Sequence, residues 1–276
     1  MRMNIDYQQL EKVARDIRVD IIKQTFHANS GHPGGSLSAA DIMTVLYFHE
    51  MNVDPAEPKK YGRDKFVLSK GHASPVLYAT LAHRGYFPTE ELSGFRKFGS
   101  ILQGHPDMKK VPGVEMSTGS LGQGFSSSVG MAIANKLDKN PGRIFALLGD
   151  GELQEGIIWE AAMAAAHYKL DNLVAIVDWN GLQIDGKNEE VITVNPVDEK
   201  FKSFGFHVIH VDGHSLKEIA EAFEEARAQK GKPTVIVAKT LKGKGVSYME
   251  GKAGWHGKAP SEAEAKQAVE ELGGEW

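Results

Sequence analysis

Two polar residues follow short apolar runs of the kind that form buried β-strands. Asp150 comes just after residues 143–148, and Asn180 comes shortly after residues 173–177, with a helical pattern between them. A strand, a helix and a strand in this order form a right-handed crossover, which places both residues at the carboxyl ends of neighbouring parallel strands. The Asp150 carboxylate, the Asn180 amide oxygen and a backbone carbonyl near Leu182 could then bind magnesium or calcium, with phosphate oxygens and water completing the coordination.

Glycines on both sides of Asp150 fit the same interpretation. Gly149 and Gly151 have no Cβ, so the backbone can turn sharply and approach a phosphate closely. Small and apolar residues recur at helical spacing from Glu152, and a helix beginning there would direct N–H groups and a positive dipole end at an anion. The alternative is an ordinary Asp-Gly turn in a β-hairpin. The helical pattern argues against a hairpin, but the residues by themselves leave both interpretations open.

Glycine-flanked histidines occur at three other element boundaries. His32 lies in a stretch with three glycines and a proline at 30–36, for which we expect irregular backbone. His72 follows an expected strand, and His105 follows another glycine. Each of them singly fits a structural or solvent-facing role. Together they predict a polar pocket that donates hydrogen bonds and moves protons near neutral pH.

Two glycine-rich segments could also contact an anion. Residues 116–124 precede a helix of small residues, and we prefer a phosphate or ring cradle to a flexible linker because apolar residues resume at once. The Lys-Gly-Lys-Gly run at 242–245 could be a phosphate nest or a solvated basic loop, and the residues by themselves favour the loop. By contrast, His210 and His214 are expected to be structural.

The whole chain alternates between strand and helix patterns. The expected strands lie at 65–69, 143–148, 173–177, 206–212 and 233–238. This alternation predicts an α/β fold with a doubly wound, mostly parallel sheet flanked by helices. We expect one domain over residues 1–276, with an N-terminal helix at about 7–28 and a C-terminal extension at about 257–276.

The composition excludes several classes of protein. With 32 basic and 36 acidic side chains, the formal net charge is −4, which gives no reason to expect nucleic acid as a partner. The chain has no cysteine, so disulfides and thiol catalysis are excluded. No stretch is apolar for the roughly 18 residues of a membrane span, and Met1 to Asp6 lack the apolar core of a signal peptide. We therefore expect a cytoplasmic protein without a membrane partner.

The two central stretches resemble a known cofactor motif. Gly149-Asp150-Gly151, followed thirty residues after the aspartate by Asn180, is similar to the thiamine diphosphate motif. Residues 153–156 and 168–173 resemble transketolases in particular. The resemblance implies a thiamine diphosphate-binding fold. It also implies transfer of a two-carbon ketol unit from a ketose phosphate to an aldose phosphate.

The same resemblance implies a role for each matching residue. The histidines implied to act on the substrate or in catalysis are His32, His72, His105 and His256. The contacts implied for thiamine diphosphate are His72, Gly119, Ser120, Leu121, Asp150, Gly151, Glu155, Asn180, Ile184, Lys242 and His256. The metal, Mg²⁺ or Ca²⁺, is implied at Asp150, Asn180 and Leu182. Some transketolases carry a hydroxyl residue where this chain has Gly35, so that contact is not expected here.

The resemblance also implies a partner chain. It covers only the first of three transketolase domains, and the domain that holds the aminopyrimidine and supplies an activating glutamate is missing. We therefore expect one component of a naturally split enzyme rather than a truncated chain. The implied partner is a C-terminal transketolase subunit, with Glu155 near the subunit contact, an α2β2 assembly, sugar phosphates as substrates and no activity of this chain by itself.

Other interpretations remain within the same fold. Deoxyxylulose-phosphate synthase and the α chain of a 2-oxoacid dehydrogenase also carry the metal motif, and a non-catalytic binding subunit would retain the fold without turnover. Residues 31–34, and Lys242 paired with Trp255-His256-Gly257, favour transketolase. A nicotinamide-binding domain is disfavoured because no Gly-x-Gly-x-x-Gly follows the first strand.

Overall fold

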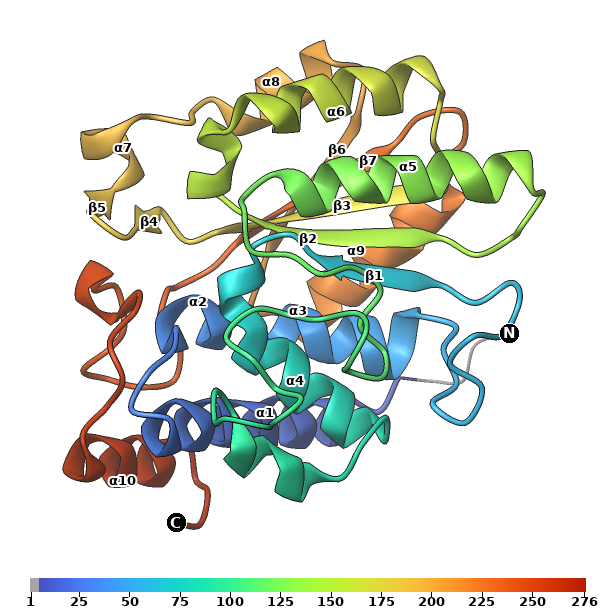
Figure 1. The fold of residues 1–276 in the computed structure, drawn as a ribbon. Helices are drawn as coiled ribbons and strands as arrows, with labels where there is room; N and C mark the ends of the chain where they lie inside the picture. Colours follow the sequence, from blue (N-terminus) through green and yellow to red (C-terminus); the bar gives the residue numbers. More distant parts are fainter. Residues whose placement is uncertain (1–4) are drawn as a thin grey trace.

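A five-stranded parallel sheet runs through the centre of the computed structural model, which describes residues 5–276 (Figure 1). Residues 1–4, part of the expected domain and of the N-terminal stretch considered above, lie outside the described residues. The strand order is β1-β2-β3-β7-β6. The strands are β1 (Lys65–Leu68), β2 (Ile144–Gly149), β3 (Leu173–Trp179), β6 (His207–Asp212) and β7 (Thr234–Lys239), and a separate antiparallel pair consists of β4 (Leu182–Gln183) and β5 (Gly186–Lys187).

Helices cover both faces of this sheet, which confirms the predicted doubly wound α/β fold (Figure 1). One face is covered by α1 (Tyr7–His27), α3 (Ala40–Val45), α4 (Ser74–Arg84) and α9 (Leu216–Ala228), and the other by α5 (Gln123–Leu137), α6 (Gly156–His167) and α8 (Val197–Ser203). The remaining helices are α2 (Pro33–Leu37), α7 (Asn188–Val191) and α10 (Glu262–Glu271). Within residues 5–276, no helix is both long and apolar enough to cross a membrane.

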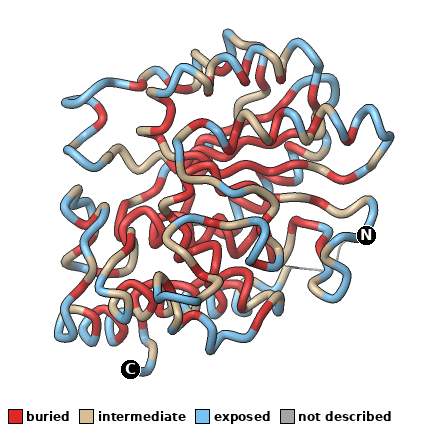
Figure 2. Tube along the Cα trace, viewed as in Figure 1, coloured by how far each residue is buried: buried red, intermediate tan, exposed pale blue. Residues whose placement is uncertain are grey.

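Side-chain alternation along the strands divides the interior into two cores. On β2, Phe145 and Leu147 belong to the core on the α1 side, whereas Ala146 and Leu148 belong to the core under α5 and α6. Burial is high along the central strands and in α2 and α3, while the β4–β5 pair is largely outside the core (Figure 2). Because both faces are covered, polar chemistry is confined to the ends of the strands.

The stretch at 30–36 is more regular than expected. Pro33–Leu37 forms the short helix α2, where the sequence predicts irregular backbone. Pro33 suits the first turn of a helix because its missing N–H would have no partner there. Gly34 allows close contact, since a Cβ there would lie 2.8 Å from the Trp255 carbonyl oxygen.

The segment after Asp150 also differs from expectation. A continuous helix from Glu152 is predicted, but a 3₁₀ turn (Gly151–Gln154) comes first and α6 begins only at Gly156. The reason is the side chain of Glu152, which is buried and accepts hydrogen bonds from the backbone N–H groups of Gly122 and Gly149 at 2.7 and 2.9 Å. The turn brings this carboxylate inward, and a helix follows it, so the hairpin alternative is wrong at this position.

Candidate functional site

A cavity of about 270 Å³ opens where β1, β2, β3 and β7 end. Gly149 and Asp178 are paired across β2 and β3, so Asp150 and Asn180 each lie just beyond a paired position at the same edge of the sheet. Most of the predicted site residues line this cavity, namely His72, Leu121, Asp150, Gly151, Glu155, Asn180, Leu182, Ile184, Lys242 and His256. His32, His105, Gly119 and Ser120 do not line it.

Asp150 is a buried carboxylate held by backbone groups. It accepts hydrogen bonds from the N–H groups of Gly151 at 2.8 Å and Gly181 at 2.5 Å. Burial, reinforced by the nearby charge of Asp178, raises the pKa of Asp150 to about 6. Asp150 lies at the cavity wall, where burial disfavours its charged form. A cation bound beside it would stabilise that form, so Asp150 is suited to be an oxygen ligand of a metal.

Asn180 and Leu182 offer two more oxygens beside it. The backbone N–H of Leu182 donates to Asn180 Oδ1 at 3.1 Å, and Asn180 Nδ2 donates to the Asp178 carboxylate at 3.4 Å. These contacts orient the amide. The Leu182 carbonyl accepts a hydrogen bond from Lys242 Nζ at 2.9 Å. The Lys242 ammonium therefore contacts the same Leu182 carbonyl oxygen that we expect to bind the metal.

Three imidazoles form a cluster, and two of them, His72 and His256, line the cavity. The ring centroids of His32 and His72 are 5.2 Å apart, those of His72 and His256 are 5.0 Å apart, and those of His32 and His256 are 5.4 Å apart. His105 is placed separately, against Gly119, where a Cβ would lie 3.2 Å from the imidazole. The structure therefore brings together three of the four predicted histidines, and the fourth borders the glycine segment.

Cations and partial burial keep this histidine cluster neutral at physiological pH. Desolvation, aided by Arg96, lowers the pKa of His32 to about 4, and desolvation, aided by Lys242, lowers that of His256 to about 3. Desolvation also lowers the pKa of Lys242 to about 8, and Lys242 Nζ lies 3.1 Å from His256 Nδ1. The neutral rings can each donate one hydrogen bond and accept another.

Sequence reasoning missed a buried ion pair beneath the site. Lys70 and Asp178 are 2% and 0% exposed and form a short contact across 108 positions of the chain. Lys70 Nζ also donates to the Gly35 carbonyl at 2.7 Å, and Asp178 accepts hydrogen bonds from the hydroxyls of Ser38 and Thr240. The pair therefore joins the ends of β1, β3 and β7 to α2. The local sequence around Lys70, a lysine followed by a glycine, does not indicate that this side chain has a buried acidic partner.

Glu152 is a second missed residue. Besides the Gly122 and Gly149 N–H groups, its carboxylate accepts the Ser69 hydroxyl at 2.5 Å. Ser69 Oγ in turn accepts the N–H of Phe125, at the start of α5. This carboxylate fixes the glycine-rich segment before α5 against the end of β2.

Arg96 is the third missed residue. It has the left-handed backbone angle φ 58° and its guanidinium packs on Gly104, where a Cβ would lie 2.7 Å from Cζ. Arg96 Nη1 donates to Ser30 Oγ at 3.1 Å, and its Nε is buried without a partner in the described chain. Non-glycine residues with positive φ cluster at functional sites. The sequence offers no sign of this conformation, although the glycine before His105 marks the close approach.

The cavity fits a metal-bound diphosphate better than a metal alone. Among the described residues, no group of three histidine or acidic side chains could hold a metal ion. The oxygens of Asp150, Asn180 and Leu182 would therefore need phosphate oxygens to complete a coordination shell. Lys242 and the glycines on both sides of Asp150 supply the charge and the room for that anion.

Comparisons with known proteins agree with this geometry. A family model described as transketolase, thiamine diphosphate binding domain, matches residues 8–276. The fold and this match define the chain as a thiamine diphosphate binding domain. More particularly, the chain belongs to the transketolase family.

Two relatives are similar over nearly their whole length. The 6-deoxy-6-sulfo-D-fructose transketolase subunit SqwG of Clostridium sp. (strain MSTE9) is 46% identical over 97% of this chain and 96% of its own length. One of the subunits of the apulose-4-phosphate transketolase of Phocaeicola vulgatus is 44% identical over 96% of this chain and 94% of its own length. Both relatives are named as components of a larger enzyme.

Other relatives are longer. Human transketolase is 45% identical over 96% of this chain, which spans 42% of the human protein. The crystal structure of transketolase from Campylobacter jejuni superimposes with a TM-score of 0.92 and 38% identity, covering 99% of this chain and 44% of that one. This chain therefore corresponds to less than half of these transketolases.

Proposed function

We propose that this chain is the N-terminal, diphosphate-binding component of a two-component transketolase. It would act in the transfer of a two-carbon ketol unit from a ketose phosphate to an aldose phosphate. The observation that carries this proposal is the cavity at the strand ends, where Asp150, Asn180 and the Leu182 carbonyl face Lys242 beside a cluster of neutral histidines. The family membership and the relatives named as subunits support it.

The chain's first task is to hold the cofactor. Asp150, Asn180 Oδ1 and the Leu182 carbonyl would bind Mg²⁺ or Ca²⁺, and the cation would bind the diphosphate. Lys242 would pair with the phosphate oxygens, and Gly151 with Glu155 and Ile184 would border the rest of the cofactor. When bound, thiamine diphosphate supplies an electron sink for cleavage of the carbon–carbon bond of the ketose.

The chain's second task is to manage protons and hydroxyl groups. His32, His72 and His256 are within ring contact of one another. As neutral imidazoles they would donate hydrogen bonds to the sugar hydroxyls and accept hydrogen bonds from them, whereas the low pKa values of His32 and His256 oppose the uptake of a full proton. His105 and the segment from Gly119 to Leu121 would border the same space. The anchored Arg96 adds a fixed positive charge near His32.

A second polypeptide would complete the site. The proposal gives the aminopyrimidine-binding domain and its activating glutamate to a C-terminal transketolase subunit. Glu155 and Ile184 line the open cavity, and both are exposed in this chain, so a partner could cover them. An α2β2 assembly would also need contact between copies of this chain, for which the exposed Met163 and Tyr168 at α6 offer apolar surface.

The test is reconstitution. The chain is mixed with a C-terminal transketolase subunit encoded beside it, with thiamine diphosphate and Mg²⁺, and ketol transfer is assayed on sugar phosphates. Because two relatives are named for a sulfosugar and for apulose 4-phosphate, the donor panel includes both. We expect turnover only when both chains are present. Turnover by this chain without a partner would contradict the split, and no turnover with any donor would contradict the activity.

A further inference from the structure

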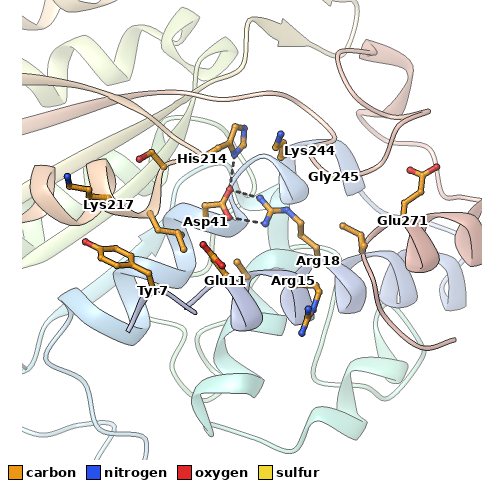
Figure 3. A pocket seen from close by; sticks show the side chains of 14 residues that line it. Tyr7, Glu11, Arg15, Arg18, Asp41, His214, Lys217, Lys244, Gly245 and Glu271 are labelled. Atoms are coloured by element: carbon orange, nitrogen blue, oxygen red, sulfur yellow. Dashed lines mark hydrogen bonds and ion pairs between the residues drawn. The ribbon is translucent and has the colours of Figure 1, made fainter. Parts of the chain in front are cut away.

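A second cavity, of about 600 Å³, lies between α1, α9 and the segment that follows β7 (Figure 3). Three side chains from separate elements form a row along its wall: Arg18 of α1, Asp41 of α3 and His214 after β6. Arg18 Nη1 and Nη2 donate to the two oxygens of Asp41 at 2.9 and 2.6 Å. His214 Nδ1 lies 2.8 Å from Asp41 Oδ2. We name this row the Arg18–Asp41–His214 relay.

The relay continues to the backbone of the cofactor site. The backbone N–H of Leu241 donates to His214 Nε2 at 2.9 Å. Because an amide N–H can only donate, Nε2 is unprotonated, and the ring proton is on Nδ1, where it is donated to Asp41. The relay thus ends in a hydrogen bond at the residue directly before Lys242.

Lys242 is held from both sides by such bonds. On one side His214 binds the N–H of Leu241, and on the other the N–H of Gly243 donates to the Gly34 carbonyl at 3.0 Å. Between these two anchors the Lys242 side chain extends to the Leu182 carbonyl, 60 positions away in the sequence. A shift in either anchor would move the lysine ammonium relative to the oxygens of the cavity.

The charges of Arg18 and Asp41 keep the Arg18–Asp41–His214 relay in one hydrogen-bonding arrangement. Asp41 is 7% exposed and Arg18 is 8% exposed. Although burial opposes its charge, Arg18 and His214 hold the pKa of Asp41 below its usual value. An ionised Asp41 keeps the His214 proton on Nδ1. Since the imidazole borders a cavity, these hydrogen bonds rather than close packing hold it in position on that side.

We propose that Arg18, Asp41 and His214 are positioning residues that fix Lys242 for the diphosphate through the Leu241 N–H. This inference rests on the proposed role of Lys242. It adds the reason why the Lys242 side chain is held in its position. None of the three residues lines the cofactor cavity itself. Their effect on cofactor binding is therefore transmitted through the backbone between Leu241 and Gly243.

Two substitutions of His214 each keep one of its two hydrogen bonds and remove the other. In His214→Gln, the amide oxygen can take the place of Nε2 and still accept the Leu241 N–H. In His214→Asn, the amide nitrogen can take the place of Nδ1 and still donate to Asp41, but nothing reaches Leu241. Both variants place a neutral amide at the cavity wall, so each is the control for the other. If His214→Asn does not fold, His214→Ala replaces it, because that variant also removes the acceptor of the Leu241 N–H and leaves the Arg18–Asp41 pair intact.

The first measurement is amide hydrogen exchange by mass spectrometry on this chain. An ordinary hydrogen bond corresponds to about a fivefold change in an equilibrium constant. We expect His214→Asn to speed exchange about fivefold or more in residues 240–246 and His214→Gln to leave it within about twofold. Equal exchange in a folded His214→Asn variant and the wild type would overturn the proposal, whatever the function of the protein.

The second measurement is a double-mutant cycle with Lys242→Ala, using inorganic pyrophosphate with Mg²⁺ as the probe in calorimetry. We expect His214→Asn to weaken binding about fivefold in the wild type and not at all in the Lys242→Ala background. Equal losses in both backgrounds would show that His214 does not act through Lys242 and would overturn the proposal. No binding by the wild type even with the partner chain present, or no effect of Lys242→Ala, would instead refute the proposed diphosphate site.

Discussion

The buried pair of Lys70 and Asp178 gives the sharpest prediction for stability. In Asp178→Asn, the Lys70 ammonium stays 2% exposed and keeps only the Gly35 carbonyl as a partner within residues 5–276. Breaking a buried ion pair on one side costs about 3–5 kcal/mol, because the other charge stays buried. The asparagine keeps one acceptor oxygen, which can still accept a hydrogen bond from the Thr240 hydroxyl. We therefore expect the lower end, about 3 kcal/mol of unfolding free energy.

Urea unfolding tests this value. With a slope of about 3 kcal/mol per molar, a loss of about 3 kcal/mol lowers the midpoint by about 1 M. The double variant Lys70→Met with Asp178→Asn removes both charges and should recover most of that loss. Glu221→Gln, which removes one partner of an exposed pair with Lys217, is the matched control and should leave the midpoint unchanged. A double variant as unstable as the single one would refute the reasoning.

Three further predictions concern the cofactor site. Because burial raises the pKa of Asp150 to about 6, protons compete with Mg²⁺ below that pH, so metal affinity should fall from pH 7 to pH 5. Asp150→Asn should weaken metal binding at every pH, because it removes the charge and its single amide oxygen cannot replace both oxygens that accept the N–H groups of Gly151 and Gly181. Gly34→Ala should weaken cofactor binding measured by calorimetry, because its Cβ would lie 2.8 Å from the Trp255 carbonyl oxygen, whereas Gly35→Ala, with 3.8 Å to its nearest neighbour, should not. Glu152→Gln should speed hydrogen exchange in residues 119–125, since an amide cannot accept all three donors at once.

Results that would contradict these three predictions are equally specific. A metal affinity that is the same at pH 7 and at pH 5 would show that protonation of Asp150 does not compete with metal binding. Equal affinities in Gly34→Ala and Gly35→Ala would show that the contact with Trp255 does not matter. Unchanged exchange in a folded Glu152→Gln variant would show that the glycine-rich segment is held by something else.

Much of the fold could be predicted because its signals are local. Apolar runs that end at glycine or at polar residues mark β2 and β3, and the helical spacing between them fixes the crossover. That topology then requires Asp150 and Asn180 to meet at one edge, as they do. The three glycine-flanked histidines could be placed at element boundaries because a glycine, which permits a close approach of the backbone, is visible in the sequence near each of them.

The missed residues depend on contacts that no local pattern records. Lys70 and Asp178 meet across 108 positions, and either residue in isolation resembles an ordinary surface charge. In the short helix Pro33–Leu37, Gly34 contacts Trp255, and its carbonyl accepts the N–H of Gly243, both of which are distant in the sequence. His214 was expected to be structural, and only the structure shows which backbone group it holds.

The most direct test of the central claim is a crystal structure of the chain with thiamine diphosphate and Mn²⁺, together with the partner chain where it is needed for binding. Anomalous scattering locates the Mn²⁺ ion. We predict a peak bounded by the Asp150 carboxylate, Asn180 Oδ1 and the Leu182 carbonyl, at about 2.0–2.2 Å from each oxygen, with the diphosphate on its open side. A peak elsewhere, or a diphosphate bound without contact to these three oxygens, would contradict the account.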